Sequence, residues 1–276
     1  MGTWSKVWRH PGMMVGLLLV LTVVAVALLA PYLTSYSPTR GDLLESLEPP
    51  SAKHPFGTDL QGRDVMTRVF YGARISLLVG LVVQGVALSL GTSMGLLAGY
   101  YRGRWDDILT GIITLVQSFP GLLFAIAVMA VLGPSLYNVF IALGLVSWTA
   151  MARLVRSETL SLRESLFVQA SKAAGGSSFH IIIRHILPNL LGPLLVLFTL
   201  GFATAILSEA SLSFLGLGVQ PPDPSWGSML ADGRERVWDA PWLMLYPGLA
   251  IFFTILGLNL LGDGLRDLLD PKLKGR

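Results

Sequence analysis

Long apolar runs alternate with shorter polar stretches along the whole sequence. A helix that crosses a bilayer needs roughly 20 mostly apolar residues. Six runs approach or exceed that length, at about residues 13–30, 75–100, 107–132, 136–153, 190–214 and 242–262. The pattern predicts an all-α membrane protein with six transmembrane helices.

The first apolar run, "MMVGLLLVLTVVAVALLA", is preceded by Lys6 and Arg9 and followed by Pro31. Basic residues also precede the apolar core of a secretory signal peptide. That core spans only roughly 7–15 residues, however, and this run is longer. We therefore expect a membrane anchor that stays in place.

The stretch "RDVMTRVFYGARISL" before the second run is amphipathic when it is drawn as a helix. Its apolar residues share one face, and Asp64, Thr67 and Arg68 lie on the other. This predicts a separate helix on the outer membrane surface. The chain then divides into an N-terminal anchor region, residues 1–74, and a core of five transmembrane helices, residues 75–276.

The composition agrees with a membrane protein. Hydrophobic residues make up 53% of the chain and charged residues 13%, whereas soluble domains carry roughly 25% charged residues. The chain has no cysteine, which excludes disulfides, Cys-ligated zinc and thiol chemistry.

The distribution of basic residues predicts how the helices run. Six spans place both termini on one side of the membrane. If that side is the cytoplasm, the cytoplasmic stretches hold 13 of the 20 Lys and Arg residues, and the outer stretches hold 7 together with nine acids. The positive-inside rule therefore favours cytoplasmic termini. The polar loop 157–189 then lies in the cytoplasm, and loops 31–74 and 215–241 lie outside.

The second run contains Gly91, Gly95, Gly99 and Gly103, each four residues apart. This spacing places them along one helical face, where small residues let helix backbones approach closely. The row predicts a packing surface, either within this chain or against a partner subunit.

Three further residues are candidates for a pathway or its outer cover. Pro120 removes a helix hydrogen bond inside the third run and predicts a break there, as transport proteins often use. Glu209 is the one ionisable residue well inside a predicted span, either functional or a structural acid near the outer end. Trp226 belongs to the Gly- and Pro-rich segment "SFLGLGVQPPDPSWGSMLADGRE", which predicts an ordered outer loop.

No pattern predicts an enzyme. A phosphate-binding loop needs Gly-Lys followed by Ser or Thr, and no lysine follows a glycine. The histidines are scattered, and His180 and His185 lie on different faces of a helix, so no metal site is expected. We expect no cofactor on this chain and no nucleic-acid partner. A transporter of this composition would take its energy from another subunit.

The loop 157–189 includes "SETLSLRESLFVQASKAAGG", which predicts a helix that ends at Gly175 and Gly176. Small side chains in its last turns give a low surface for close packing: Ala170, Ser171, Ala173 and Ala174. Pro188 would begin the next span at a position where proline is tolerated. The loop is therefore either a docking helix for a soluble partner or a solvated connector.

The same loop resembles the EAA loop of ABC-importer permeases. That pattern is Glu-Ala-Ala, three residues, Gly, nine residues, then Ile-x-Leu-Pro. Here Gln169 replaces Glu, Ser171 replaces the second Ala, and His185 stands at the Ile position. The residues implied to contact an ATPase are Gln169, Ala170, Ser171, Lys172, Ala173, Ala174, Gly175, Leu187 and Pro188. Without the Glu, we expect this contact to rest on shape more than on charge.

The segments 54–77, 184–189 and 208–230 are similar to the C-type permease subunit of dipeptide and oligopeptide importers, a group that includes nickel and glutathione transporters. The resemblance implies a non-catalytic subunit in a prokaryotic inner membrane. It implies a second homologous permease, two ATPases that use ATP and Mg, and an extracytoplasmic binding protein. In relatives the loop 215–241 forms a scoop over the pathway.

Several alternatives remain open at this stage. Within the same architecture, the cargo could be nickel, a metal chelate or glutathione. The chain could also be a self-sufficient secondary carrier, although inverted-repeat signs and intramembrane charge pairs are lacking in the sequence. A third class is a membrane scaffold for the same ATPases.

Overall fold

The structure is a computed structural model that describes residues 10–269. This part of the chain is helical, without a β-strand. Its helices are α2 (Pro11–Leu33), α3 (Val65–Tyr101), α4 (Arg104–Gln117), α5 (Gly121–Leu132), α6 (Leu136–Arg163), α7 (Leu166–Ala173), α8 (Ser178–Ile181), α9 (Leu187–Phe214), α10 (Trp226–Gly233) and α11 (Trp242–Leu269). Shorter turns are η1 (Leu43–Glu45), the π-helical η2 (Ile182–Ile186) and η3 (Arg234–Arg236).

Five helical stretches are long and apolar enough to cross a membrane, and α4 with α5 would form a sixth. The five are α2, α3, α6, α11 and the continuous stretch that joins α8, η2 and α9. The prediction of an all-α membrane protein is confirmed. Helices follow from the apolar runs because lipid offers no partners to backbone N–H and C=O groups, and a helix pairs them internally.

The third predicted span is not one continuous helix. α4 and α5 meet at a bend of 84°, and Pro120 is the residue that caps the start of α5. Proline has no N–H to continue the hydrogen-bond ladder, and it disfavours the helical conformation of the preceding residue. The expected break at Pro120 is therefore a sharp corner rather than a kink within a single span.

The prediction of a separate surface helix before the second span is wrong. The residues concerned form the first turns of α3, which is continuous from Val65. The Asp64 carboxylate caps this helix and accepts a hydrogen bond from the Thr67 N–H at 2.7 Å. The side expected to face water is buried, with Arg68 only 3% exposed, because loop segments pack on it.

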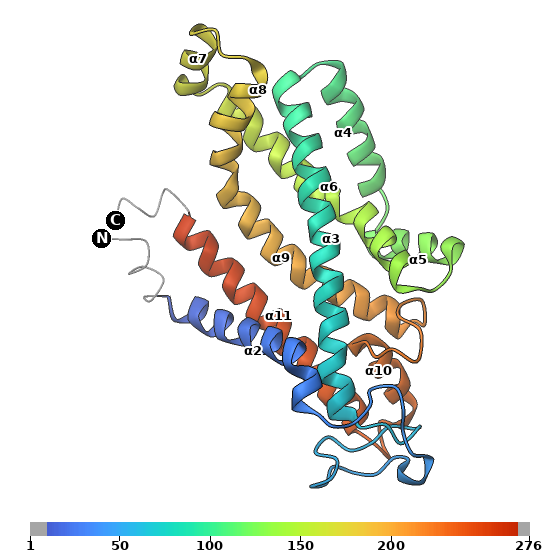
Figure 1. The fold of residues 1–276 in the computed structure, drawn as a ribbon. Helices are drawn as coiled ribbons and strands as arrows, with labels where there is room; N and C mark the ends of the chain where they lie inside the picture. The colour runs from blue at the N-terminus through green and yellow to red at the C-terminus, as the bar shows by residue number, and fades with distance from the viewer. Residues whose placement is uncertain (1–9, 270–276) are drawn as a thin grey trace.

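α3 runs the length of the molecule (Figure 1). α7 and α8 lie at one end of the bundle, which we call the α7 end. The loop 34–64 and α10 lie at the opposite end, which we call the α10 end. α2 and α11 pack closely together, and Gly16 lies directly against the backbone of Gly257.

The glycine row packs α3 against α6 of the same chain. A β-carbon built on Gly91, Gly95 or Gly99 would lie 2.6 or 2.7 Å from an atom of α6, closer than real β-carbons come. Gly103 departs from the prediction, because it precedes α4 with φ +63° and nothing lies near it. The row therefore holds the bundle together from within and ends where the chain turns.

Candidate functional site

The loop 157–189 is more helical than predicted. α6 continues to Arg163, and α7 begins only three residues later, so the expected helix is broken at its centre. Its end agrees with the prediction. Gly175 has φ +84°, a conformation open to glycine. The Gly176 N–H donates to the Ser171 carbonyl at 3.0 Å, which closes the helix in the manner of a Schellman motif.

α7 is fixed to the bundle by its inner face. Val168 is 3% exposed and belongs to a core cluster that includes Ile181, Ile186 and Leu190. That cluster also contains residues of α3 and α6. A force on α7 would therefore reach several long helices directly.

The outer face of the α7 end carries large apolar side chains that the sequence interpretation missed. Leu166 is 84% exposed and Phe179 75%, and Phe167 is also exposed. The predicted small residues Ala170, Ala173 and Ala174 are exposed beside them. The sequence does indicate their exposure, because Leu166 and Phe167 directly precede Val168. If Val168 is buried, its two neighbours on the helix turn away from the core.

Gln169 has a local role in this conformation. Its side-chain amide donates to the Glu164 carbonyl at 3.0 Å, across the break between α6 and α7. Lys172, in the last turn of α7, is exposed. No negative charge stands at position 169.

Pro188 lies in the first turn of α9, as predicted. The preceding turns lead into α9 without a break, however, so the helical stretch as a whole runs from Ser178 to Phe214. The π-helical turn at 182–186 precedes the proline and accommodates its missing N–H. Leu187 packs against the core cluster beneath α7.

Two ion pairs support the base of the α7 end. Arg156 of α6 binds Asp106 of α4 through two nitrogens, and the Nη2–Oδ2 distance is 2.8 Å. Arg102 Nη2 lies 2.7 Å from Glu164 Oε1, but both side chains are exposed and this pair contributes little. The bidentate pair fixes the start of α4 against α6.

Glu209 lies inside the subunit rather than along a surface. It is 0% exposed, and its Oε1 accepts a hydrogen bond from Ser213 at 2.6 Å. Its Oε2 has no hydrogen-bond partner within the described part of the chain. The position of Glu209 favours an internal, structural acid over a residue that lines a pathway in this conformation.

Trp226 begins α10 and is also buried. Its indole N–H donates to the Val69 carbonyl of α3 at 2.9 Å. The ring lies against Gly72, where a β-carbon would be 3.0 Å from it. The predicted outer loop 215–241 is therefore ordered, with a short helix fastened to α3.

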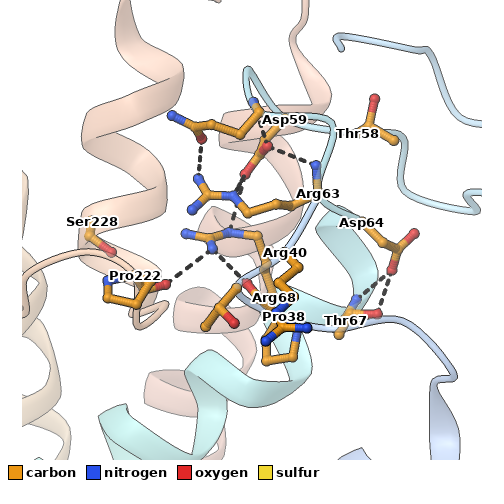
Figure 2. A network of polar contacts seen from close by, with 12 residues as sticks. Pro38, Arg40, Thr58, Asp59, Arg63, Asp64, Thr67, Arg68, Pro222 and Ser228 are labelled. Atoms are coloured by element: carbon orange, nitrogen blue, oxygen red, sulfur yellow. Dashed lines mark hydrogen bonds and ion pairs between the residues drawn. The ribbon is translucent and has the colours of Figure 1, made fainter. Parts of the chain in front are cut away.

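Arg68 joins three segments at the α10 end (Figure 2). Its Nη1 donates to the Pro38 carbonyl at 2.8 Å and lies 3.5 Å from the Pro222 carbonyl. Its Nε lies 3.3 Å from Asp59 Oδ2, which also binds Arg63 at 2.6 Å. This buried network ties the loop 34–64 and the loop after α9 to the start of α3.

A second polar cluster orders the same loop. His54 is 1% exposed and lies between Asp64 at 2.9 Å and Glu45 at 3.1 Å. Lys53 also binds Glu45. The hydrogen bond from Lys53 lowers the pKa of the Glu45 carboxyl most, and the hydrogen bond from His54 lowers it further. Buried polar contacts thus hold the loop 34–64 in a defined conformation at the α10 end.

Comparison with known families gives two matches. Residues 91–275 match the binding-protein-dependent transport system inner membrane component family. Residues 2–50 match the N-terminal transmembrane domain of oligopeptide transport permease C.

Curated relatives match nearly the full length. A dipeptide transport system permease protein, DppC, of Alkalihalophilus pseudofirmus is 51% identical over 94% of this chain and 86% of its own length. A putative peptide transport system permease protein of Brucella abortus is 48% identical over 99% of this chain and 92% of its own length. The glutathione transport system permease protein GsiD of Escherichia coli is 45% identical over 99% of this chain and 91% of its own length.

Among solved structures, an inward-facing form of the MetNI methionine ABC transporter contains a similar chain. The TM-score is 0.62 at 17% identity, over 74% of this chain and 97% of the other. At this identity the likeness shows a shared fold.

Proposed function

The chain belongs to the binding-protein-dependent transport system inner membrane component family, and we propose from this that it carries dipeptides or oligopeptides into the cytoplasm as a permease of an ATP-driven importer. The observation that supports this most is the 51% identity to a dipeptide permease over 94% of the chain. The match includes the loop 34–64 and the α7 end, where the structure has its two ordered surfaces. These are the surfaces that such a permease needs.

We place the energy source in two separate ATPase subunits. The chain carries no phosphate-binding loop of its own, since none of its lysines follows a glycine. The α7 end offers what a docking element requires, which is a short helix anchored by Val168 and exposed on its outer face. In this arrangement ATP and Mg bind only to the partners.

The docking contact combines large and small side chains. Leu166 and Phe179 are exposed apolar groups suited to pockets on a partner, and alanines between them allow close approach. With Gln169 in place of a carboxylate, the contact holds by burial of apolar surface rather than by a salt bridge. Nucleotide-driven movement of the partner then shifts α7 and, through the shared core, α6 and α9.

The orientation follows from this docking. We place the α7 end, the start of α2 and the end of α11 in the cytoplasm, and the α10 end outside. There the loop 34–64 and the segment 215–241 would receive peptide from an extracytoplasmic binding protein. A second, homologous permease would complete the pathway.

A second cargo is favoured by one observation. The glutathione permease GsiD is 45% identical over nearly the whole chain. Glutathione is itself a peptide derivative, so the same pathway could accept it.

Uptake in proteoliposomes tests the cargo. We expect the complex, purified with its associated subunits, to accumulate a labelled dipeptide only when ATP is present on the ATPase side. Unlabelled dipeptide should reduce this uptake at lower concentration than glutathione or a nickel chelate does. Preferential competition by glutathione would move the assignment to the second cargo, and uptake without ATP would contradict an ATP-driven importer.

A further inference from the structure

An apolar groove lies between four membrane-spanning helices at the side of the bundle. Its volume is about 510 Å³, and its walls come from α2, α3, α9 and α11. Each helix contributes apolar side chains to the wall, among them Val24, Leu78, Phe202 and Leu261 in that order. Because all four helices are candidate membrane spans, the groove is placed to meet lipid chains.

One cation lies at this groove. Arg74 is exposed and stands on the same face of α3 as Leu77, Leu78 and Leu81, at spacings of three, four and seven residues. The other polar side chain of the wall, Thr199, donates to the Leu195 carbonyl at 2.8 Å and is satisfied.

The guanidinium of Arg74 has no acidic partner within residues 10–269. It lies 5.5 Å from the ring centroid of Tyr71, one turn earlier on α3. Arg74 follows the start of α3 by nine residues, or about 14 Å along the helix. This puts the charge near the α10 end of the groove, where a long side chain can reach the headgroup region.

We propose that this groove binds an anionic phospholipid, with an acyl chain along its apolar wall and the phosphate on Arg74. The apolar wall and the unpaired guanidinium at one end of it together require a ligand that is apolar over most of its length and negatively charged at one end. The guanidinium donors of Arg74 match the oxygens of a phosphate group in number and geometry. A soluble phosphate would leave the apolar wall uncovered.

The groove has room for a long chain. A second hollow of about 440 Å³ lies between α3 and α9 on the side toward Leu187, and Phe198 lines both hollows. A lipid tail held at Arg74 can therefore extend past Leu81 along the same seam. A protein helix from a partner is the less favoured occupant, because it would cover the apolar wall but leave Arg74 without an anionic partner unless it carried an acid at the same level.

The test is lipid retention by the protein purified from membranes with whatever subunits remain bound. Native mass spectrometry would count phosphatidylglycerol and phosphatidylethanolamine on the unaltered protein, on Arg74→Gln and on Arg74→Lys. We expect preferential retention of phosphatidylglycerol, a drop of about tenfold or more in Arg74→Gln, and partial retention in Arg74→Lys. Arg40→Gln, which removes a similarly exposed arginine from the loop 34–64, should behave like the unaltered protein.

A phosphatidylglycerol with a photoreactive acyl chain would identify the groove directly. Labelled peptides should come from the groove walls on α3 and α9, and less label should appear in Arg74→Gln. Equal phosphatidylglycerol retention in Arg74→Gln and the unaltered protein would overturn the proposal. So would a groove that resists labelling because a helix of another subunit occupies it. In delipidated protein the melting temperatures of the variants should match, since Arg74 is exposed and no bound lipid then stabilises one variant over another.

Discussion

Leu166→Asp will release the ATPase subunits from the complex and abolish ATP-driven peptide uptake. Leu166 is 84% exposed at the α7 end, so its loss does not disturb the core of this chain. Burying a leucine on docking contributes about 1.5–3 kcal/mol, and an unpaired carboxylate in the contact costs several kcal/mol more. Since each 1.4 kcal/mol is a factor of about ten in affinity, docking should weaken by at least about 100-fold.

The measurement is the amount of ATPase that copurifies with the tagged permease, together with uptake. Leu44→Asp is the matched control, because Leu44 is 91% exposed but lies at the α10 end. The control should retain the ATPases in full. If Leu166→Asp and Leu44→Asp retain equal amounts of ATPase, α7 is not the docking element.

Arg68→Met will loosen the α10 end and stop peptide uptake while leaving the ATPases bound. Arg68 is 3% exposed and joins the carbonyls of Pro38 and Pro222 to Asp59. Removing one partner of a buried ionic network costs about 3–5 kcal/mol, because the remaining polar groups lose their hydrogen bonds without regaining water. The loss of stability and uptake in Arg68→Lys should be smaller than in Arg68→Met but still measurable, since one ammonium group cannot contact all three oxygens in a fixed geometry.

Limited proteolysis and thermal unfolding in detergent check this prediction. We expect rapid cleavage within the loop 34–64 of Arg68→Met and a lower melting temperature. Arg40→Met removes an exposed arginine of the same loop and should remain resistant. Identical cleavage and melting of Arg68→Met and Arg40→Met would mean that the network around Asp59 does not hold this surface.

The prediction of the α7 segment succeeded where local chemistry decides the structure. A glycine at position 175 ends the helix because it takes φ +84°, and this requirement can be recognised in the sequence. The same holds for Pro120, where a missing N–H marks the break. The bend of 84° at Pro120 could not be predicted, since its size depends on how α5 packs against α6.

The prediction for Arg68 failed because amphipathic analysis assigns every polar face to water. The arginine is instead covered by the loop 34–64 and the segment after α9, which bring Asp59 and two carbonyls to it. Contacts between residues this far apart in the chain follow no regular sequence interval, so they cannot be recognised in a single sequence. For Glu209 the sequence left a functional and a structural acid open. The structure favours the structural one, since Ser213 binds it and Ser225, at the start of α10, donates to Ser213.

Leu166 and Phe179 are apolar residues that are exposed, the reverse of the buried Arg68. Their exposure becomes evident only once Val168 is seen to take the buried position on α7. The resemblance in sequence directed attention to Gln169 and the alanines, which are polar or small. The larger side chains beside them are the ones that expose apolar area for a partner.

Crosslinking from α7 is the most direct test of the claim that this chain is driven by an ATPase at the α7 end. The chain has no cysteine, so Ala173→Cys places a single thiol on the exposed face of α7 for a short photoactivatable crosslinker. In the active complex we predict a product with an ATPase subunit, in a yield that changes when ATP binds, and none from Leu44→Cys. ATP-driven uptake without any ATPase product from position 173 would contradict the account.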